Sequence, residues 1–167
     1  MDSIKVSAIA VLAVLAALAA GAQPGTPEDR PAAGAPVTVA IRADKKTYSQ
    51  RDPITLTLTA KNPGKSPVKL MFNSGMKYDF EIRKGKQPGG EAVWQWSRGR
   101  MFGQMILFST LEPGKTLTFT EKFQPGEPAG DGKPLPTLEP GTYTATGFLA
   151  LGGRAPRPMA RTTFVVK

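Results

Sequence analysis

Apolar and polar residues alternate along most of this chain with a period of two. In residues 37–41 and 54–59, every second residue is Val, Ile or Leu, and the residues between them are mostly threonine, alanine or a charged side chain. Such alternation is typical of a β-strand with one buried face. Turn residues interrupt it at regular intervals. For example, Asn62-Pro63-Gly64 ends one run, because proline has no amide to donate and glycine admits positive φ.

This pattern predicts about nine short strands and no helix in the mature chain. The sequence contains 18 glycines and 16 prolines, the residue types that most often form the turns between strands. Evenly spaced strands with such turns predict an all-β, immunoglobulin-like antiparallel β-sandwich. Tyr143, directly after Glu139-Pro140-Gly141, stands where a tyrosine corner would stand in such a fold. The predicted strands are Val37–Ile41, Ile54–Leu58, Val68–Phe72, Tyr78–Ile82, Ala92–Trp96, Ile106–Phe108, Leu117–Phe123, Thr142–Leu149 and Thr162–Val166.

Residues 1–22 have the layout of a secretory signal peptide. An apolar run from Val6 to Ala20 follows Lys5 and ends in Ala20-Gly21-Ala22, which resembles an A-x-A cleavage site. A membrane-spanning helix needs about 20 apolar residues, and this run is shorter. An uncleaved N-terminal anchor and a core helix remain the alternatives. We therefore expect cleavage after Ala22 and a location outside the cytoplasm: secreted, periplasmic or at the cell surface.

The remaining chain divides into two parts. Residues 23–36 are almost entirely Pro, Ala, Gly and a few charges, so they cannot bury apolar surface and are expected to form a flexible linker. Residues 37–167 are expected to form one β-sandwich domain. No stretch within this domain has the length and hydropathy of a membrane span.

The composition narrows the chemistry that the chain can perform. The sequence contains no cysteine and no histidine, which removes thiolate and imidazole nucleophiles, imidazole bases and nearly all transition-metal sites. We therefore expect no enzyme activity, no catalytic residue, no metal and no cofactor. The net charge of +9 favours acidic partners. Because the cations are scattered and not clustered, specific nucleic-acid binding is not predicted.

Two pairs of residues could still form a site. Asp79 and Glu81 share the outer face of one predicted strand, and paired carboxylates are what a glycosidase uses, but an ordinary surface strand explains them equally well. Trp94 and Trp96 also share a strand face. They are either core residues whose indole N–H groups find internal partners or an exposed aromatic surface for a carbohydrate or peptide.

The middle of the chain contains a series of short motifs in a fixed order. They are Phe72-Asn73-Ser74-Gly75, Tyr78-Asp79-Phe80, Val93-Trp94-Gln95-Trp96-Ser97, Met101-Phe102-Gly103-Gln104 and Leu111-Glu112-Pro113-Gly114, with Asn62 before them and Pro140-Gly141-Thr142-Tyr143 after them. In their order and spacing these motifs resemble the BsuPI family of intracellular proteinase inhibitors. The resemblance spans about Tyr48 to Leu149 and implies a strand-rich domain of this size that binds a serine protease of the subtilisin type. The family's name refers to an intracellular inhibitor, whereas this chain has a predicted export signal.

Two basic loops are the candidate partner-binding tips. Arg98 and Arg100 flank Gly99 just before Met101, and Arg154 and Arg157 belong to a segment stiffened by two prolines. An inhibitor needs a pre-organised extended loop, and a peptide bond that precedes proline is a poor protease substrate. The alternative function is a non-inhibitory adhesion or scaffolding module of the cell envelope that binds an acidic polymer or protein.

Overall fold

The computed structural model describes residues 37–86, 92–153 and 157–167. These residues form ten strands and no helix, which confirms the all-β prediction. The predicted signal peptide and linker, residues 1–36, lie outside the described residues. The strands are β1 (Thr38–Ala43), β2 (Thr47–Tyr48), β3 (Ile54–Lys61), β4 (Val68–Phe72), β5 (Tyr78–Lys84), β6 (Ala92–Gln95), β7 (Leu107–Leu111), β8 (Thr116–Phe123), β9 (Gly141–Leu149) and β10 (Met159–Val166).

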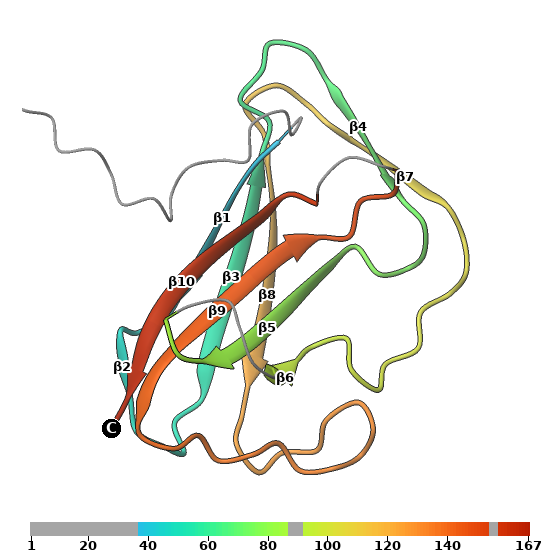
Figure 1. Ribbon diagram of the computed structural model, residues 1–167. Coiled ribbons are helices and arrows are strands. Elements are labelled where there is room, and N and C mark those ends of the chain that lie inside the picture. The colour runs from blue at the N-terminus through green and yellow to red at the C-terminus, as the bar shows by residue number, and fades with distance from the viewer. Residues whose placement is uncertain (1–36, 87–91, 154–156) are drawn as a thin grey trace, which may run out of the picture.

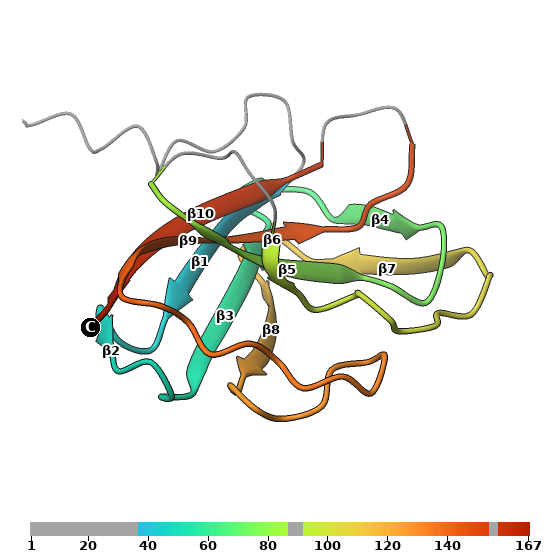
Figure 2. The ribbon, with the colours of Figure 1, turned by 60° about the horizontal axis from the view of Figure 1, so that its bottom comes forward.

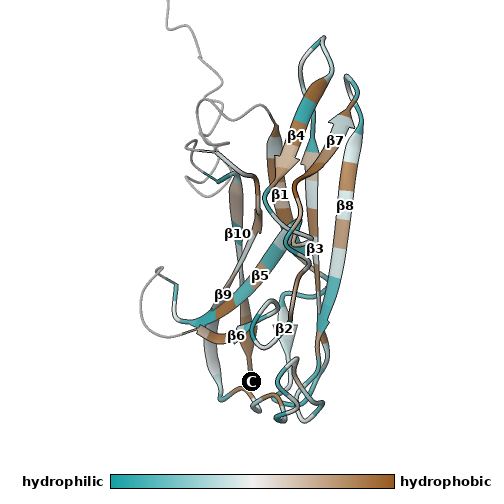
Figure 3. Ribbon diagram, turned by 90° about the vertical axis from the view of Figure 1, so that its right-hand side faces the viewer, coloured by the Kyte–Doolittle hydropathy of each residue, from teal (hydrophilic) through white to brown (hydrophobic). Residues whose placement is uncertain are grey.

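The strands make two layers of an immunoglobulin-like β-sandwich (Figures 1 and 3). One layer is a five-stranded sheet in the order β2-β10-β9-β5-β6, and the other contains the three-stranded sheet β1-β3-β8. The pair β4-β7 forms a separate two-stranded ladder. All pairs are antiparallel except β2, which runs parallel to β10 through two residue pairs. The sequence did not predict β2, because two residues are too few to show an alternation.

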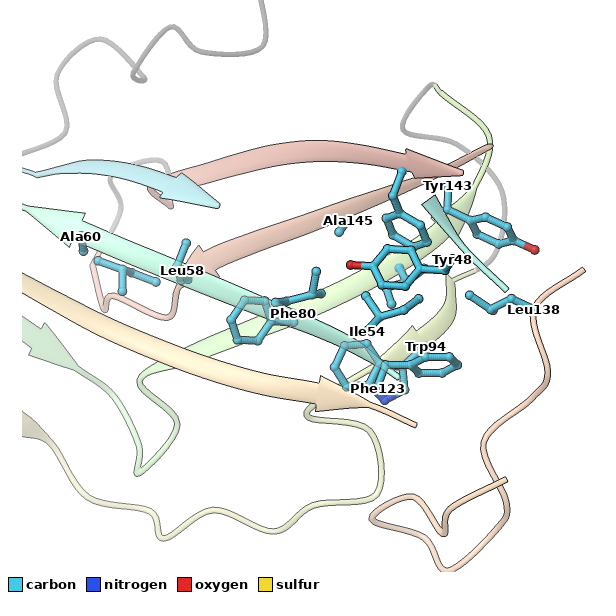
Figure 4. Close-up of a cluster of buried hydrophobic side chains, with 14 of the residues drawn as sticks. Tyr48, Ile54, Leu58, Ala60, Phe80, Trp94, Phe123, Leu138, Tyr143 and Ala145 are labelled. Atoms are coloured by element: carbon cyan, nitrogen blue, oxygen red, sulfur yellow. The ribbon is translucent and has the colours of Figure 1, made fainter. Parts of the chain in front are cut away.

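The predicted alternation sets which side chains enter the core. In β3, the residues Ile54, Leu56, Leu58 and Ala60 are buried, and the threonines between them are partly exposed. The inner faces of β5 and β9 supply the opposite wall of the core, and Figure 4 shows a large part of this core. Side chains from both sheets interdigitate there, as in other sandwiches.

A tyrosine corner fixes the entry to β9. The hydroxyl of Tyr143 donates a 2.8 Å hydrogen bond to the carbonyl oxygen of Glu139, four residues earlier. Its ring stacks on that of Phe164 in β10, with centroids 5.6 Å apart and planes 11° apart. The corner predicted from the Pro-Gly turn is therefore present, and it ties the long β8–β9 connection to the sheet.

A second polar corner joins β1, β2 and β3. The Tyr48 hydroxyl donates to Asp44 Oδ1 at 2.7 Å, and the backbone amide of Thr55 donates to the same oxygen at 2.7 Å. Burial raises the pKa of Asp44, but these hydrogen bonds outweigh it and lower the pKa below the usual aspartate value. Asp44 therefore stays ionised at neutral pH, and this corner remains formed.

Candidate partner-binding surface

The β6–β7 connection, residues 96–106, passes from the five-stranded sheet to the β4-β7 ladder along the side of the sandwich (Figure 2). It contains three of the five predicted partner-binding residues. We call this segment the contact loop. Its amino-terminal part is a tight turn, in which Arg98 N donates to Gln95 O and Arg100 N donates to Ser97 O. Its position and shape depend on four separate attachments to the sandwich.

The first attachment is the buried carboxylate of Asp79 in β5. Its Oδ1 accepts hydrogen bonds from the backbone amides of Phe80 at 2.8 Å and Ser97 at 3.0 Å. Its Oδ2 accepts from Gln95 Nε2 at 2.7 Å and from Ser97 Oγ at 2.5 Å. The side chain is 1% exposed, and four donors satisfy its oxygens. Asp79 thus fixes the start of the contact loop on the outer face of the sheet.

The expectation of two carboxylates on a surface strand is therefore wrong for Asp79. The alternation placed Asp79 and Glu81 on the correct face, since Asp79 pairs in register with Phe148 and Glu81 with Thr146 on that face. The turn at Ser97 then folds back over Asp79 and removes it from water. Glu81 stays partly exposed and pairs with Arg83. The two carboxylates have different surroundings and do not form a catalytic pair.

The second attachment is an aromatic stack that runs outward from the core. The ring of Tyr78 lies between those of Phe119 in β8, at 4.4 Å, and Trp96, at 4.6 Å. The guanidinium of Arg100 lies 4.8 Å from the centre of the Trp96 ring, and Arg100 Nε donates to the Trp96 carbonyl oxygen at 2.9 Å. A cation held over an indole face is attracted by its quadrupole. This stack therefore holds the Arg100 side chain against the loop's own base.

The inner end of this stack is also fixed. The Tyr78 hydroxyl donates a 2.5 Å hydrogen bond to Glu121 Oε1 in β8. Burial, followed by this hydrogen bond to a carboxylate, raises the pKa of Tyr78, so the hydroxyl keeps its proton. The base of the contact loop is thus connected to both layers of the sandwich.

The third attachment is a close approach of two glycines. Gly99 has φ of +74°, and a Cβ built there would lie 2.5 Å from the Asp131 amide nitrogen. A Cβ on Gly130 would lie 2.9 Å from the carbonyl oxygen of Arg98. Backbones can approach this closely only where side chains are absent. The β8–β9 connection, through Gly130 and Asp131, therefore braces the turn of the contact loop.

The fourth attachment holds the carboxyl-terminal half of the loop. Gly75 N donates to Gly103 O at 2.8 Å, and Met105 N donates to the same oxygen at 3.1 Å, closing a tight turn around Gln104. The ring of Phe102 lies 5.6 Å from that of Trp96, tilted by 45°. The segment between these attachments is short, and Met101 lies within it.

The contact loop exposes an unusual number of apolar side chains. Met101 is 99% exposed, Met105 is 56% exposed and Ile106 is 62% exposed, and Phe108 on β7 follows at 59%. The Lys69 ammonium lies 4.5 Å from the centre of the Phe108 ring. The sequence signal for this surface was available, because residues 101–108 contain several large apolar residues without the period-two alternation of a half-buried strand. Exposed apolar surface of this kind marks interaction sites.

The family model for intracellular proteinase inhibitors, BsuPI, matches residues 41–153. The chain belongs to this family. The resemblance seen in the sequence is thus confirmed, and the contact loop and all four of its attachments fall inside the matched region of the BsuPI domain. Membership of a proteinase inhibitor family implies a protease as partner. No curated protein of matching sequence was found.

The BsuPI domain of this chain is also similar in structure to several solved proteins. The sporulation control protein Spo0M from Bacillus subtilis is 14% identical with a TM-score of 0.49, over 80% of this chain and 50% of that protein. A β-glucosidase from Erythrobacter marinus is 16% identical with a TM-score of 0.41, over 78% of this chain and 16% of the enzyme. A CARDB domain from Pyrococcus furiosus is 14% identical with a TM-score of 0.42, over 84% of this chain and 97% of that domain. At such identities the likeness concerns the fold alone.

The five predicted partner-binding residues of this BsuPI domain do not share one loop. Arg98, Arg100 and Met101 lie together in the contact loop, where Arg98 is exposed and borders a hollow of about 120 Å³ that Asp131 and Lys133 also line. Arg157 belongs to the β9–β10 connection, and its guanidinium lies 5.6 Å from the Phe148 ring. Arg154 lies outside the described residues. The structure thus places the two candidate tips on different connections.

The two tryptophans of the BsuPI domain have different surroundings. Trp94 is 7% exposed and meets the Phe123 ring edge to face at 5.6 Å, as expected of a core residue. Trp96 is only partly buried and belongs to the base of the contact loop. Within the described ranges, its Nε1 is buried without a hydrogen-bond partner, so the interpretation as a core residue whose indole N–H finds an internal partner is wrong for Trp96. Neither ring forms part of a flat exposed aromatic pair.

The described residues of the BsuPI domain contain no cluster of three or more His, Cys, Asp or Glu side chains that could hold a metal ion. Among the same residues, no helix is long and apolar enough to cross a membrane.

Proposed function

We propose that this protein is an exported inhibitor of subtilisin-type serine proteases and that the contact loop enters the protease cleft. Family membership supports inhibition in general. The observation that supports this particular loop is the exposure of Met101, at 99%, between segments that are fixed to the sandwich on both sides. Arg98 and Arg100 precede Met101 in the same loop and make this side of the surface basic.

The physical reason is pre-organisation. An inhibitor binds tightly when its loop is already in the bound conformation, because little conformational entropy is then lost on association. A standard interface of about 1,600 Å² around such a loop supports tight binding. The four attachments of the contact loop supply this rigidity, with the buried Asp79 contributing the largest number of hydrogen bonds.

The proposal is tested by titrating subtilisin-type proteases with the full chain. We expect the residual activity to fall linearly and to reach zero near one inhibitor per active site. A charge-reversed variant, Arg98→Glu with Arg100→Glu, is expected to bind more weakly and to associate more slowly, and Arg157→Glu serves as the matched control on the other loop. If a panel of subtilisin-like and trypsin-like proteases stays fully active with excess folded protein, the proposal of inhibition is wrong. The favoured function is then that of an envelope adhesion or scaffolding module.

Export belongs to the same proposal and rests on residues 1–22. The protein recovered from its producing cells is expected to begin at or near Gln23, outside the cytoplasm. Amino-terminal sequencing of the isolated protein checks this. An intact form that starts at Met1 and stays in the cytoplasm would contradict export and leave the inhibitory proposal in place.

A further inference from the structure

We infer that Met101 is the side chain that fills the primary specificity pocket of the inhibited protease. The inference rests on the proposed inhibitory function and names the class of target: proteases whose pocket accepts a long, unbranched apolar side chain. Proteases with a carboxylate at the base of that pocket, such as trypsin, are excluded as targets.

The exposure of Met101 is the first argument. A side chain that is 99% exposed contributes almost no burial to folding, so its thioether is available to a partner in full. The neighbouring exposed residues Met105 and Ile106, at 56% and 62%, are partly covered by the protein itself. Methionine is unbranched and polarisable, and it adapts to the shape of an apolar pocket.

The backbone on either side of Met101 is the second argument. Within the described part of the chain, the amides of Met101 and Phe102 donate no hydrogen bond to another residue. Proteins bind extended peptide segments by adding them to an open strand edge, which requires unpaired amides and carbonyls. Held by Arg100 on one side and Gly103 on the other, this short segment keeps its backbone groups free without becoming mobile.

The position of Arg100 decides between the two kinds of pocket. Arg100 precedes Met101, and a free arginine there would suit a trypsin-like pocket. Its guanidinium is instead held 4.8 Å from the Trp96 ring centre while its Nε donates to the Trp96 carbonyl oxygen. To enter a pocket, it would first lose both contacts. Among the residues that the structure describes, the side chain of Met101 makes no such contact, so it is the side chain presented.

The test is an exchange of specificity at one position. The wild-type chain is expected to inhibit subtilisin and chymotrypsin but not trypsin. Met101→Ala is expected to raise the inhibition constant for subtilisin by about 30-fold, the effect of losing a central hot-spot side chain. Met101→Arg is expected to lose these targets and to inhibit trypsin. The matched control is Met105→Arg, which places the same side chain four residues away in the same loop and is expected not to inhibit trypsin.

Each outcome is informative because Met101 is almost fully exposed and its variants are expected to fold. If the wild type inhibits subtilisin and both Met101 variants inhibit it equally well, the inference about Met101 is wrong, while the proposed inhibition stands with another contact residue. If trypsin rapidly cuts Met101→Arg without being inhibited, the loop is a substrate and the inference is again wrong. If the wild type inhibits no protease, the proposed function and this inference both fall.

Discussion

Replacing Asp79 by alanine is expected to lower the free energy of unfolding by about 3 kcal/mol or more. The substitution removes a buried acceptor group and leaves the donors of Phe80, Gln95 and Ser97, which are buried or partly buried, without this partner. Hydrogen bonds to charged groups contribute about 1.5–3 kcal/mol each, and unsatisfied buried donors add a desolvation cost. Urea denaturation followed by circular dichroism measures the loss.

The matched control is Glu81→Ala, which removes a carboxylate from the same strand and the same face two residues further on. Glu81 is partly exposed and, among the described residues, its carboxylate pairs with Arg83 alone, so a loss of about 1 kcal/mol or less is expected. Equal losses in the two variants would contradict the anchoring role of Asp79. In the inhibition assay, Asp79→Ala is also expected to weaken the titration, because the start of the contact loop is released.

Replacing Trp94 by alanine is expected to cost about 3–5 kcal/mol, because the ring is almost fully buried and its removal leaves a large cavity beside Phe123. The same measurement on Trp96→Ala is expected to show a smaller loss, since that ring is only partly buried. In the inhibition assay, the two substitutions are expected to rank in the opposite order. Trp96→Ala is expected to weaken inhibition more, because Arg100 and Phe102 both rest on Trp96.

A loss of stability below about 1 kcal/mol for Trp94→Ala would mean that the ring is outside the core. Unchanged inhibition by folded Trp96→Ala would show that the aromatic base does not position the contact loop. The two tryptophans thus separate folding from recognition in one pair of variants.

Much of the fold could be predicted because it depends on local patterns. The alternation in β3 determines which residues are buried, and the Pro-Gly turn before Tyr143 determines the corner. The ends of the strands were predicted less accurately. The carboxyl-terminal strand begins at Met159, earlier than the predicted Thr162, because pairing with β9 continues beyond the alternating residues.

The contact loop could be predicted only in part, because its attachments join residues that are distant in the sequence. Asp79 and Ser97 are 18 positions apart, and alternation says which face Asp79 occupies but not what covers that face. The bracing of Gly99 by Gly130 likewise depends on how two connections cross. The basic residues of the loop were visible in the sequence, whereas the buried residues that fix it were not.

The glycine contact has a consequence for how inhibitors of this kind change their targets. Gly99 and Gly130 leave no room for any other side chain, so both positions are closed to variation unless the two connections separate. Met101 lies two residues from this contact and is fully open to solvent. Substitutions at Met101 can therefore accumulate without a cost in folding stability. The close contact at Gly99 and Gly130 meanwhile preserves the backbone conformation that displays each new side chain. A library randomised at position 101 with both glycines retained would sample new protease targets on an unchanged scaffold.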